Sequence, residues 1–358
     1  MTHPIHERNE EAIPRSWSRR GLAIARTPDE KGYGVVGDPC IVRDEAIAAW
    51  RMFVFADPHG QGEAVSLECD AEGLPLRWSR VEPLRYAEPL PAGRKFFHKP
   101  YLVQEAARPN QPARIGGEYW LLSVAFDCDT KRKDVYRARS QSLSGPWLWD
   151  DAPLIPTGGP GAFDEKHVDA VSGFYFPERG EVLYFYMGYP LHAQARQLSP
   201  FGNAQGLAVQ RHDEPTVRKL GEFLPPSEVP GHWTGGYLGG FQLLPGITHR
   251  WIALLNGSPT PPDPGDASIA CEEPAPSLGG WAVCDEAWPV RNWKVLDEPM
   301  ERIEAIPEDA IASGEGTNLW RHHALVLPQG RVALYYNSGS YGREQLYLKV
   351  GSRDGAMS

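Results

Sequence analysis

The sequence predicts an all-β fold, a five-bladed β-propeller, and three observations lead to it. The apolar segments are short, rich in Val, Tyr, Phe and Trp, and bounded by Gly and Pro, as β-strands are. A unit of three such strands recurs five times along the chain. A further strand-like segment, PRSWSRRGLAIA, stands at the N-terminus outside these units. Helical periodicity is scarce throughout.

The five units share an apolar and aromatic middle strand. These segments are WRMFVFA (50–56), EYWLLSVAF (118–126), EVLYFYMG (181–188), HRWIALLNG (249–257) and RVALYYNSG (331–339). The strand that follows in each unit is centred near residues 66, 138, 208, 282 and 348, so the steps are 72, 70, 74 and 66 residues. Such a regular period is typical of a repeat architecture, and we expect each unit to form one blade.

A fourth strand is expected in four of the units. It carries Trp78, Trp147 or Trp293 in three of them and reads TVRKLGEF in the third unit. The fifth unit lacks it, and the N-terminal segment 15–26 is predicted to pair there and close the last blade, which would leave no exposed sheet edge. We therefore expect one domain over residues 1–358, with blades near 33–82, 97–152, 164–224, 232–297 and 314–352.

Composition excludes several classes of partner. The formal net charge is -10 and no long basic run exists, which disfavours nucleic-acid and membrane-surface binding. No apolar stretch reaches the roughly 18 residues of a transmembrane helix. The N-terminus lacks a secretory signal pattern, so a cytoplasmic location is expected. The five cysteines form no CxxC pair and are expected to be reduced structural thiols.

Several segments resemble the five-bladed propeller glycoside hydrolases, of which family 43 and its relatives are nearest. They are GDPCIVRD with WRMFVFA, KPYLVQ with GEYWLLSVAF and VYRARSQSLSGPW, and VDAVSGFYFPERGEVLYFYMG. The resemblance covers about residues 33–358 as a pattern rather than an identity. It implies that functional residues stand where the innermost strands begin, around a central channel. It also implies an inverting mechanism.

The resemblance assigns roles to two aspartates. Asp38 in GDPC matches the general base of blade one, and Asp169 in HVDAVSGFYF matches the blade-three Asp that orients and tunes the acid. Their separation of 131 residues fits two blades. Taken separately, Asp38 could instead be a turn residue before Pro39, and Asp169 a strand-end residue bonding loop amides.

The acid of that family, a Glu in blade four, has no direct counterpart here. The segment HWTGGYLGGFQLLPG offers His232, whereas the Glu-Gly pair typical of the acid occurs in blade five as Glu315-Gly316. Aligning LVLP (325–328) with QLLP (242–245) makes His232 and Glu315 equivalent. Since the related α-neoagarobiose hydrolases use His as the acid, both residues are candidates.

Seven further residues near strand entrances are predicted to bind substrate. The tryptophans can stack on sugar C–H groups, and the arginines can bind a carboxylate or hydroxyls. Histidines converging on the axis could instead hold a metal, although no HxxxH or HExxH spacing exists. No catalytic cofactor is expected, and a cation on the axis is an alternative. The seven are His98, His167, Trp233, Trp320, Arg321, His322 and Arg343.

These observations favour a glycoside hydrolase that acts on a small oligosaccharide or glycoconjugate. Cleaving a glycosidic bond needs one group that protonates the leaving oxygen and another that activates water or attacks carbon. Two alternatives stay open, because a fold hosts many functions. One is a propeller that only binds sugar, and the other is a biosynthetic enzyme that uses its histidines and a metal.

Overall fold

The chain folds into β-strands and turns. The computed structural model describes residues 13–14, 16–27, 34–57, 60–191, 203–245, 251–259, 277–301, 319–327, 331–339 and 343–352, and none of these is helical. Consequently, this part of the chain contains no helix that could span a membrane. The all-β prediction is confirmed.

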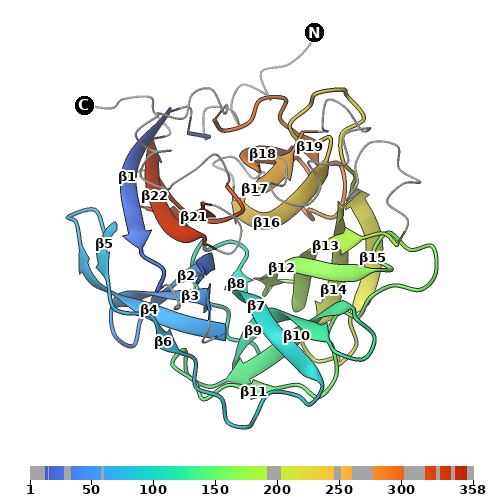
Figure 1. The fold of residues 1–358 in the computed structure, drawn as a ribbon, viewed down its shortest axis with the longest axis horizontal. Coiled ribbons are helices and arrows are strands. Elements are labelled where there is room, and N and C mark those ends of the chain that lie inside the picture. The colour runs from blue at the N-terminus through green and yellow to red at the C-terminus, as the bar shows by residue number, and fades with distance from the viewer. Residues whose placement is uncertain are drawn as a thin grey trace.

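In the described part of the chain the strands pair into four sheets, and the nine-stranded sheet combines two antiparallel groups through the parallel pair Lys133–His167. Five antiparallel groups of strands therefore surround a common centre (Figure 1). The first strand of each group contacts the first strands of neighbouring groups near that centre. These first strands are β2 (Val36–Asp44), β7 (Arg94–Leu102), β12 (His167–Phe176), β16 (Tyr237–Pro245) and β20 (Arg321–Val326). The second strands are β3 (Ala49–Ala56), β9 (Tyr119–Asp127), β13 (Glu181–Tyr189), β17 (Trp251–Ser258) and β21 (Val332–Ser338).

The third and fourth strands complete each group towards the outside. The third strands are β4 (Gly60–Cys69), β10 (Lys133–Ser140), β14 (Ala204–Arg211), β18 (Leu278–Cys284) and β22 (Gln345–Ser352). The fourth strands are β5 (Pro75–Trp78), β11 (Leu148–Trp149), β15 (Arg218–Leu224), β19 (Lys294–Val295) and, in the last group, β1 (Ser16–Ile24). The short strands β6 (Glu82–Pro83) and β8 (Gln104–Glu105) join β4 and β12.

The predicted middle strands coincide with β3, β9, β13, β17 and β21 to within about two residues. The fourth strands differ more from prediction. Near Trp147 and Trp293 only two residues pair, and those are Leu148–Trp149 and Lys294–Val295. The tryptophan rings themselves are buried, so they pack beneath the edge of the sheet rather than extend it.

The core consists of layers between neighbouring groups. Residues of β14, β18 and β21 are buried along almost their whole length, because other strand groups cover both faces of their sheets. One layer, for example, joins Ile41 and Met52 of the first group to Leu325 and Tyr335 of the last. Aromatic side chains fill these layers, which explains the strands' near-continuous apolar character.

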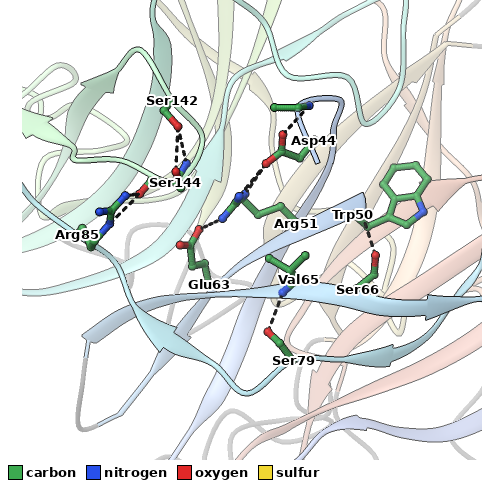
Figure 2. Close-up of polar contacts among 11 residues, drawn as sticks. Asp44, Trp50, Arg51, Glu63, Val65, Ser66, Ser79, Arg85, Ser142 and Ser144 are labelled. Atoms are coloured by element: carbon green, nitrogen blue, oxygen red, sulfur yellow. Dashed lines mark hydrogen bonds and ion pairs between the residues drawn. The ribbon is translucent and has the colours of Figure 1, made fainter. Parts of the chain in front are cut away.

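Polar contacts also tie the strands of the first group together. The buried Arg51 guanidinium donates to Asp44 Oδ2 through Nε at 3.0 Å and Nη2 at 2.8 Å, and it also contacts Glu63 (Figure 2). This network links β2, β3 and β4. The pairing satisfies a charge that would be costly to bury alone.

The N-terminal strand β1 pairs antiparallel with β22 from Ser16–Ser352 to Ile24–Leu346, with two irregularities. In Figure 1 it is the dark blue strand beside the red β22. The join is packed closely, because a side chain at Gly351 would contact Pro14 and the Trp17 ring. The Lys349 ammonium lies 5.4 Å from the centre of that ring. The first and last strands of the described chain therefore belong to one sheet.

Removal of β1 should destabilise the protein. A chain that begins after Ile24 exposes the β22 edge, which we expect to lower the melting temperature and cause aggregation. Thermal unfolding and size-exclusion chromatography measure both effects. The control is a chain that begins at Ile13 and keeps β1. Equal melting temperatures for the two truncations would contradict the prediction.

Candidate functional site

The first strands of three groups bend at β-bulges that place charged groups near the centre. In β2 the residues Asp38 and Pro39 face a single residue of β3, and in β7 Lys99 and Pro100 do the same against β9. Asp38 has φ 54° and Lys99 has φ 52°, in the left-handed region that non-glycine residues seldom occupy. At the bulge of β12, Ala170 has φ 49°. Such strain, roughly 1–3 kcal/mol per residue, tends to occur at functional sites.

Asp38 as a residue is half-buried, and charges from three other strands surround its carboxyl group. Burial raises its pKa above the usual value, while the cations Lys99 and Arg321 oppose that rise and the negative charge of Asp169 adds to it. Its backbone N–H faces Asn337 Oδ1 at 3.4 Å. A carboxyl group with a raised pKa beside a second carboxylate is suited to acid–base chemistry.

Asp169 is fully buried and held by two lysines. Lys99 Nζ donates to its Oδ1 at 2.7 Å, Lys133 Nζ donates to its Oδ2 at 3.0 Å, and the Ala170 N–H donates to Oδ1 at 2.7 Å. Burial alone would raise the pKa of Asp169, but the neighbouring cations hold it well below its usual range. Asp169 is therefore ionised near neutral pH.

Lys99 links the two aspartates. Its ammonium bonds to Asp169, and its charge also acts on Asp38. Burial lowers the pKa of Lys99, and the nearby Lys133 lowers it further, while Asp169 and Asp38 act in the opposite direction. The Lys99 side chain is 20% exposed.

Two histidines lie next to Asp169 and Lys133. His98 Nε2 is 3.8 Å from Asp169 Oδ1. His167 Nδ1 accepts a hydrogen bond from the Lys133 backbone N–H at 3.2 Å, so in the neutral ring the proton is on Nε2. Burial lowers the pKa of His167 to about 4, and the charges of Lys133 and Lys166 add to this effect. His167 is therefore a neutral hydrogen-bond donor near pH 7.

Arg321, at the start of β20, brings a buried positive charge to the centre. Its Nη2 donates to the Val171 carbonyl of β12 at 3.0 Å. Gly240 of β16 makes room for it, since a Cβ there would be 2.9 Å from Nη1. The side chain is 6% exposed, and within the described ranges Nη1 has no hydrogen-bond partner.

Amide side chains close the centre beyond these charges. Asn110 Nδ2 donates to Ala324 O at 3.0 Å, and its Oδ1 accepts from the Val326 N–H at 2.9 Å. Gln242 makes paired bonds to the Ala324 backbone, with Nε2 donating at 2.9 Å and Oε1 accepting at 2.7 Å. His323 lies against both amides and is fully buried. These bonds join β16 and the turn at Asn110 to β20.

The remaining predicted residues are spread more widely. His232 Nδ1 is 2.9 Å from Thr234 Oγ1. Burial lowers the pKa of His232, and the negative charge of Asp297 partly opposes this effect. Trp233 is 3% exposed and packs against Gly280, with its indole N–H bonded to Leu296 O at 2.9 Å, so its packing favours a role in the core.

Other predicted residues flank β20 and β22. His322 is buried next to Arg321, Trp320 is half-buried, and Arg343 is exposed just before β22. Glu315 lies outside the described residues.

Lys99 and Lys133 were missed by sequence reasoning. A signal for Lys99 was present, because Lys99-Pro100 in HKPYLV occupies the same bulge positions as Asp38-Pro39 in GDPCIV. The same comparison shows that Asp169 and Asp38 are not strictly equivalent. Asp169 is paired just before its bulge, as His98 is, whereas Asp38 is within its own. For Lys133 we see no signal, since it begins the third strand of its group.

A search for three or more His, Cys, Asp or Glu side chains placed to hold a metal ion finds none in the described parts of the chain. The cluster instead mixes cations and carboxylates, with Lys99, Lys133 and Arg321 around Asp38 and Asp169. Four of the cysteines, at positions 40, 69, 128 and 284, are free thiols.

Comparisons with known proteins connect this architecture to glycoside hydrolases. No family model and no curated protein sequence matches the chain. A solved glycoside hydrolase is similar over 100% of this chain and 97% of its own, with a TM-score of 0.69 and 13% identity. A thermostable family-43 glycoside hydrolase is similar over 90% and 92%, with a TM-score of 0.60 and 15% identity.

A third solved structure is Zg3597, a family 117 glycoside hydrolase of the marine bacterium Zobellia galactanivorans. It is similar over 95% of this chain and 91% of its own, with a TM-score of 0.56 and 12% identity. The resemblance to these hydrolases is thus confirmed in structure. Identity this low establishes a shared fold, so the function has to be argued from the site.

Replacement of Asp169 by Asn should destabilise the protein. The change leaves Lys99 and Lys133 without their shared anion, which we expect to cost about 3 kcal/mol of unfolding free energy at pH 7.

Because the pKa of Asp169 is lowered on folding, its contribution is present above the usual value of 3.8 and lost as the pH falls below it. Urea denaturation at pH 7 and at about pH 2 should show a smaller difference in unfolding free energy between the two proteins at the lower pH. Asp213→Asn, in an exposed ion pair with Arg211, is the control and should change little. A constant difference at both pH values would contradict this account.

Proposed function

We propose that the protein is a glycoside hydrolase that cleaves a small oligosaccharide or glycoconjugate at the centre of its strand groups. One observation carries the proposal. Asp38, whose pKa is raised, stands beside a carboxylate that is ionised near neutral pH, Asp169, at bulges of innermost strands. Glycoside hydrolysis requires one group that takes a proton from water and one that protonates the leaving oxygen, and Asp38 is placed for the first of these roles. The shared fold with solved glycoside hydrolases supports the proposal.

We further propose that the five strand groups are the blades of one five-bladed propeller. The contacts among the first strands support this, as does the pairing of β1 with β22. In this architecture β1 closes the last blade, and the charged cluster lies at one end of the central channel. The amide side chains of Asn110 and Gln242 then form the floor of the site.

In the proposed mechanism Asp38 is the general base. Its carboxylate takes a proton from water, and the water oxygen attacks the anomeric carbon with inversion. The bond from that carbon to the leaving oxygen breaks as the acid protonates the oxygen. Asp169 fixes Lys99 and Lys133 and sets the electrostatic potential at Asp38. His98 and His167, next to Asp169 and Lys133, are placed to donate hydrogen bonds to sugar hydroxyls.

Glu315 is the preferred acid. His232 is the weaker candidate, because its surroundings are Thr234 and Asp297 rather than the charges around Asp38. Glu344 is a further carboxyl group near the site, since its backbone carbonyl accepts the Val36 N–H at 3.1 Å where β2 begins. The sequence did not indicate Glu344, which lies outside the aligned strand entrances.

Substitution of each candidate acid in turn should show which residue is the general acid. We expect Glu315→Gln to reduce kcat at least about 100-fold, the usual contribution of a general acid. Aryl glycosides with a good leaving group need little protonation, so the variant should lose less activity on them. His232→Asn and Glu344→Gln are the matched comparisons and should retain activity. A full loss in His232→Asn with rescue by the good leaving group would transfer the role to His232.

The pH dependence of kcat/KM tests the role of Asp38. A general base must be ionised, so activity should rise with pH through the pKa of Asp38, at a value above the usual 3.8. Lys99 lowers that pKa, so Lys99→Met should shift the acidic limb to higher pH. Lys294→Gln, an exposed residue of β19, is the control and should leave the limb in place. Asp38→Asn should lose at least about 100-fold in kcat while remaining folded. An acidic limb that Lys99→Met leaves unmoved would contradict this role.

A further inference from the structure

The start of β2 is bonded to the last strand group as well as to its own. The Val36 N–H donates to the Glu344 carbonyl at 3.1 Å, and the Asp38 N–H donates to Asn337 Oδ1 at 3.4 Å. Glu344 stands just before β22, and Asn337 is on β21. The two bonds lie on either side of Gly37, so they fix the stretch of chain that leads into Asp38.

Gly37 is packed against the Asn337 side chain. A Cβ at Gly37 would be 3.0 Å from Asn337 Nδ2 and 3.1 Å from its Cβ and Cγ. Asn337 is 5% exposed, so its amide is enclosed by its surroundings. Glycine therefore allows the amide to approach the backbone immediately before Asp38, where it accepts the Asp38 N–H.

Asp38 has a backbone conformation that needs such support. Its φ of 54° is in the left-handed region, and Asp38 and Pro39 face a single residue of β3 across the bulge. A strained conformation persists only where the surrounding structure fixes it. A buried amide from another strand group meets this need, because it bonds to the strained residue itself.

Asn337 is paired across the sheet with Arg321, and both reach Asp38. Arg321 on β20 and Asn337 on β21 are direct partners, so their side chains lie on one face. The Arg321 charge acts on the Asp38 carboxyl group, and the Asn337 amide accepts the Asp38 N–H. The other charges that act on this carboxyl group are those of Lys99 from β7 and Asp169 from β12.

The fourth strand group offers a matched residue without this contact. Asn256 lies near the end of β17, as Asn337 lies near the end of β21, and it is 3% exposed. Its Nδ2 donates to Ser277 Oγ at 3.0 Å. This bond stays within the fourth group, so Asn256 has the burial of Asn337 but no bond to Asp38.

We propose that Asn337 is a positioning residue for the general base, and that with Gly37 it docks β2 on the last strand group and holds Asp38 in its left-handed conformation. The inference rests on the role of Asp38 in the proposed hydrolase function. Asn337 acts through Asp38 and has no contact with the substrate in this account. The last group thereby sets the orientation of a carboxyl group that belongs to the first.

Kinetics of Asn337→Ala on an aryl glycoside test the positioning role. We expect kcat to fall on the order of tenfold, because a small displacement of a catalytic group is costly. KM should change less than about twofold, since no contact with the substrate is removed. Asn256→Ala is the matched control, and it should lower the melting temperature but keep kcat. An equal loss of kcat in the two variants would overturn the inference.

Asn337→Asp separates positioning from general destabilisation. It keeps an acceptor for the Asp38 N–H and adds a negative charge, which disfavours the ionised form of Asp38. We expect kcat at high pH to recover most of the loss seen in Asn337→Ala, and the acidic limb of kcat/KM to move to higher pH. NMR of the carboxyl carbons in protein with ¹³C-labelled aspartate, assigned with Asp38→Asn, should show the titration of Asp38 moving the same way. A titration that does not move would overturn the inference.

The contact between Gly37 and Asn337 can be tested by thermal unfolding. Gly37→Ala should lower the melting temperature of the wild-type protein, because the new Cβ presses on the amide. It should lower it less in the Asn337→Ala background, where the amide is absent. Purely additive effects would overturn the docking of β2 through this contact.

These measurements distinguish failure of the inference from failure of the proposed function. If the wild-type protein cleaves glycosides and Asn337→Ala keeps its kcat, the hydrolase stands and the positioning role falls. If the wild-type protein cleaves no glycoside, the hydrolase falls and with it the positioning of a base. The Asp38 titration and the coupling of Gly37 with Asn337 then still decide whether Asn337 holds Asp38, because neither requires turnover.

Discussion

The structure depends on how the innermost strands satisfy their hydrogen bonds at the centre. β2, β7, β16 and β20 each stand at the end of a sheet, so no other strand of the described residues pairs with their inner edges. Buried backbone polar groups must nevertheless be bonded. Side chains from neighbouring groups do this, as Asn110, Gln242 and Arg321 bond to backbone groups of other first strands. The groups are therefore joined by side chains at the centre and by apolar layers further out.

The same requirement creates the site. Where an inner strand has no partner on one side, it can accommodate a bulge, and the left-handed residue at that bulge changes the direction of its side chain. Asp38 and Lys99 occupy such positions in β2 and β7. Pro39 and Pro100 fit next to them because a bulge needs no donor at that point. Local strain and charge thus occur together at the first strands.

Electrostatic balance then decides what each carboxyl group does. Asp169 is buried deeply, yet two lysines keep it ionised. Asp38 has only partial compensation, and its pKa rises. The two aspartates differ through their neighbours and through their positions, because Asp38 lies within its bulge whereas Asp169 is paired just before its own.

The sequence by itself determined the strand pattern, because apolar alternation, turn residues and a repeat of about 70 residues are local properties of the chain. It also indicated Asp38, Asp169 and Arg321, which stand at the starts of such strands. Only the tertiary structure decided that Lys99 and Lys133 share Asp169, since residues 70 and 36 positions away from it, on different strands, cannot be paired by spacing. It likewise placed Trp233 in the core and His232 beside Asp297. Burial and charge at a point depend on every strand that meets there, so they follow from the fold as a whole.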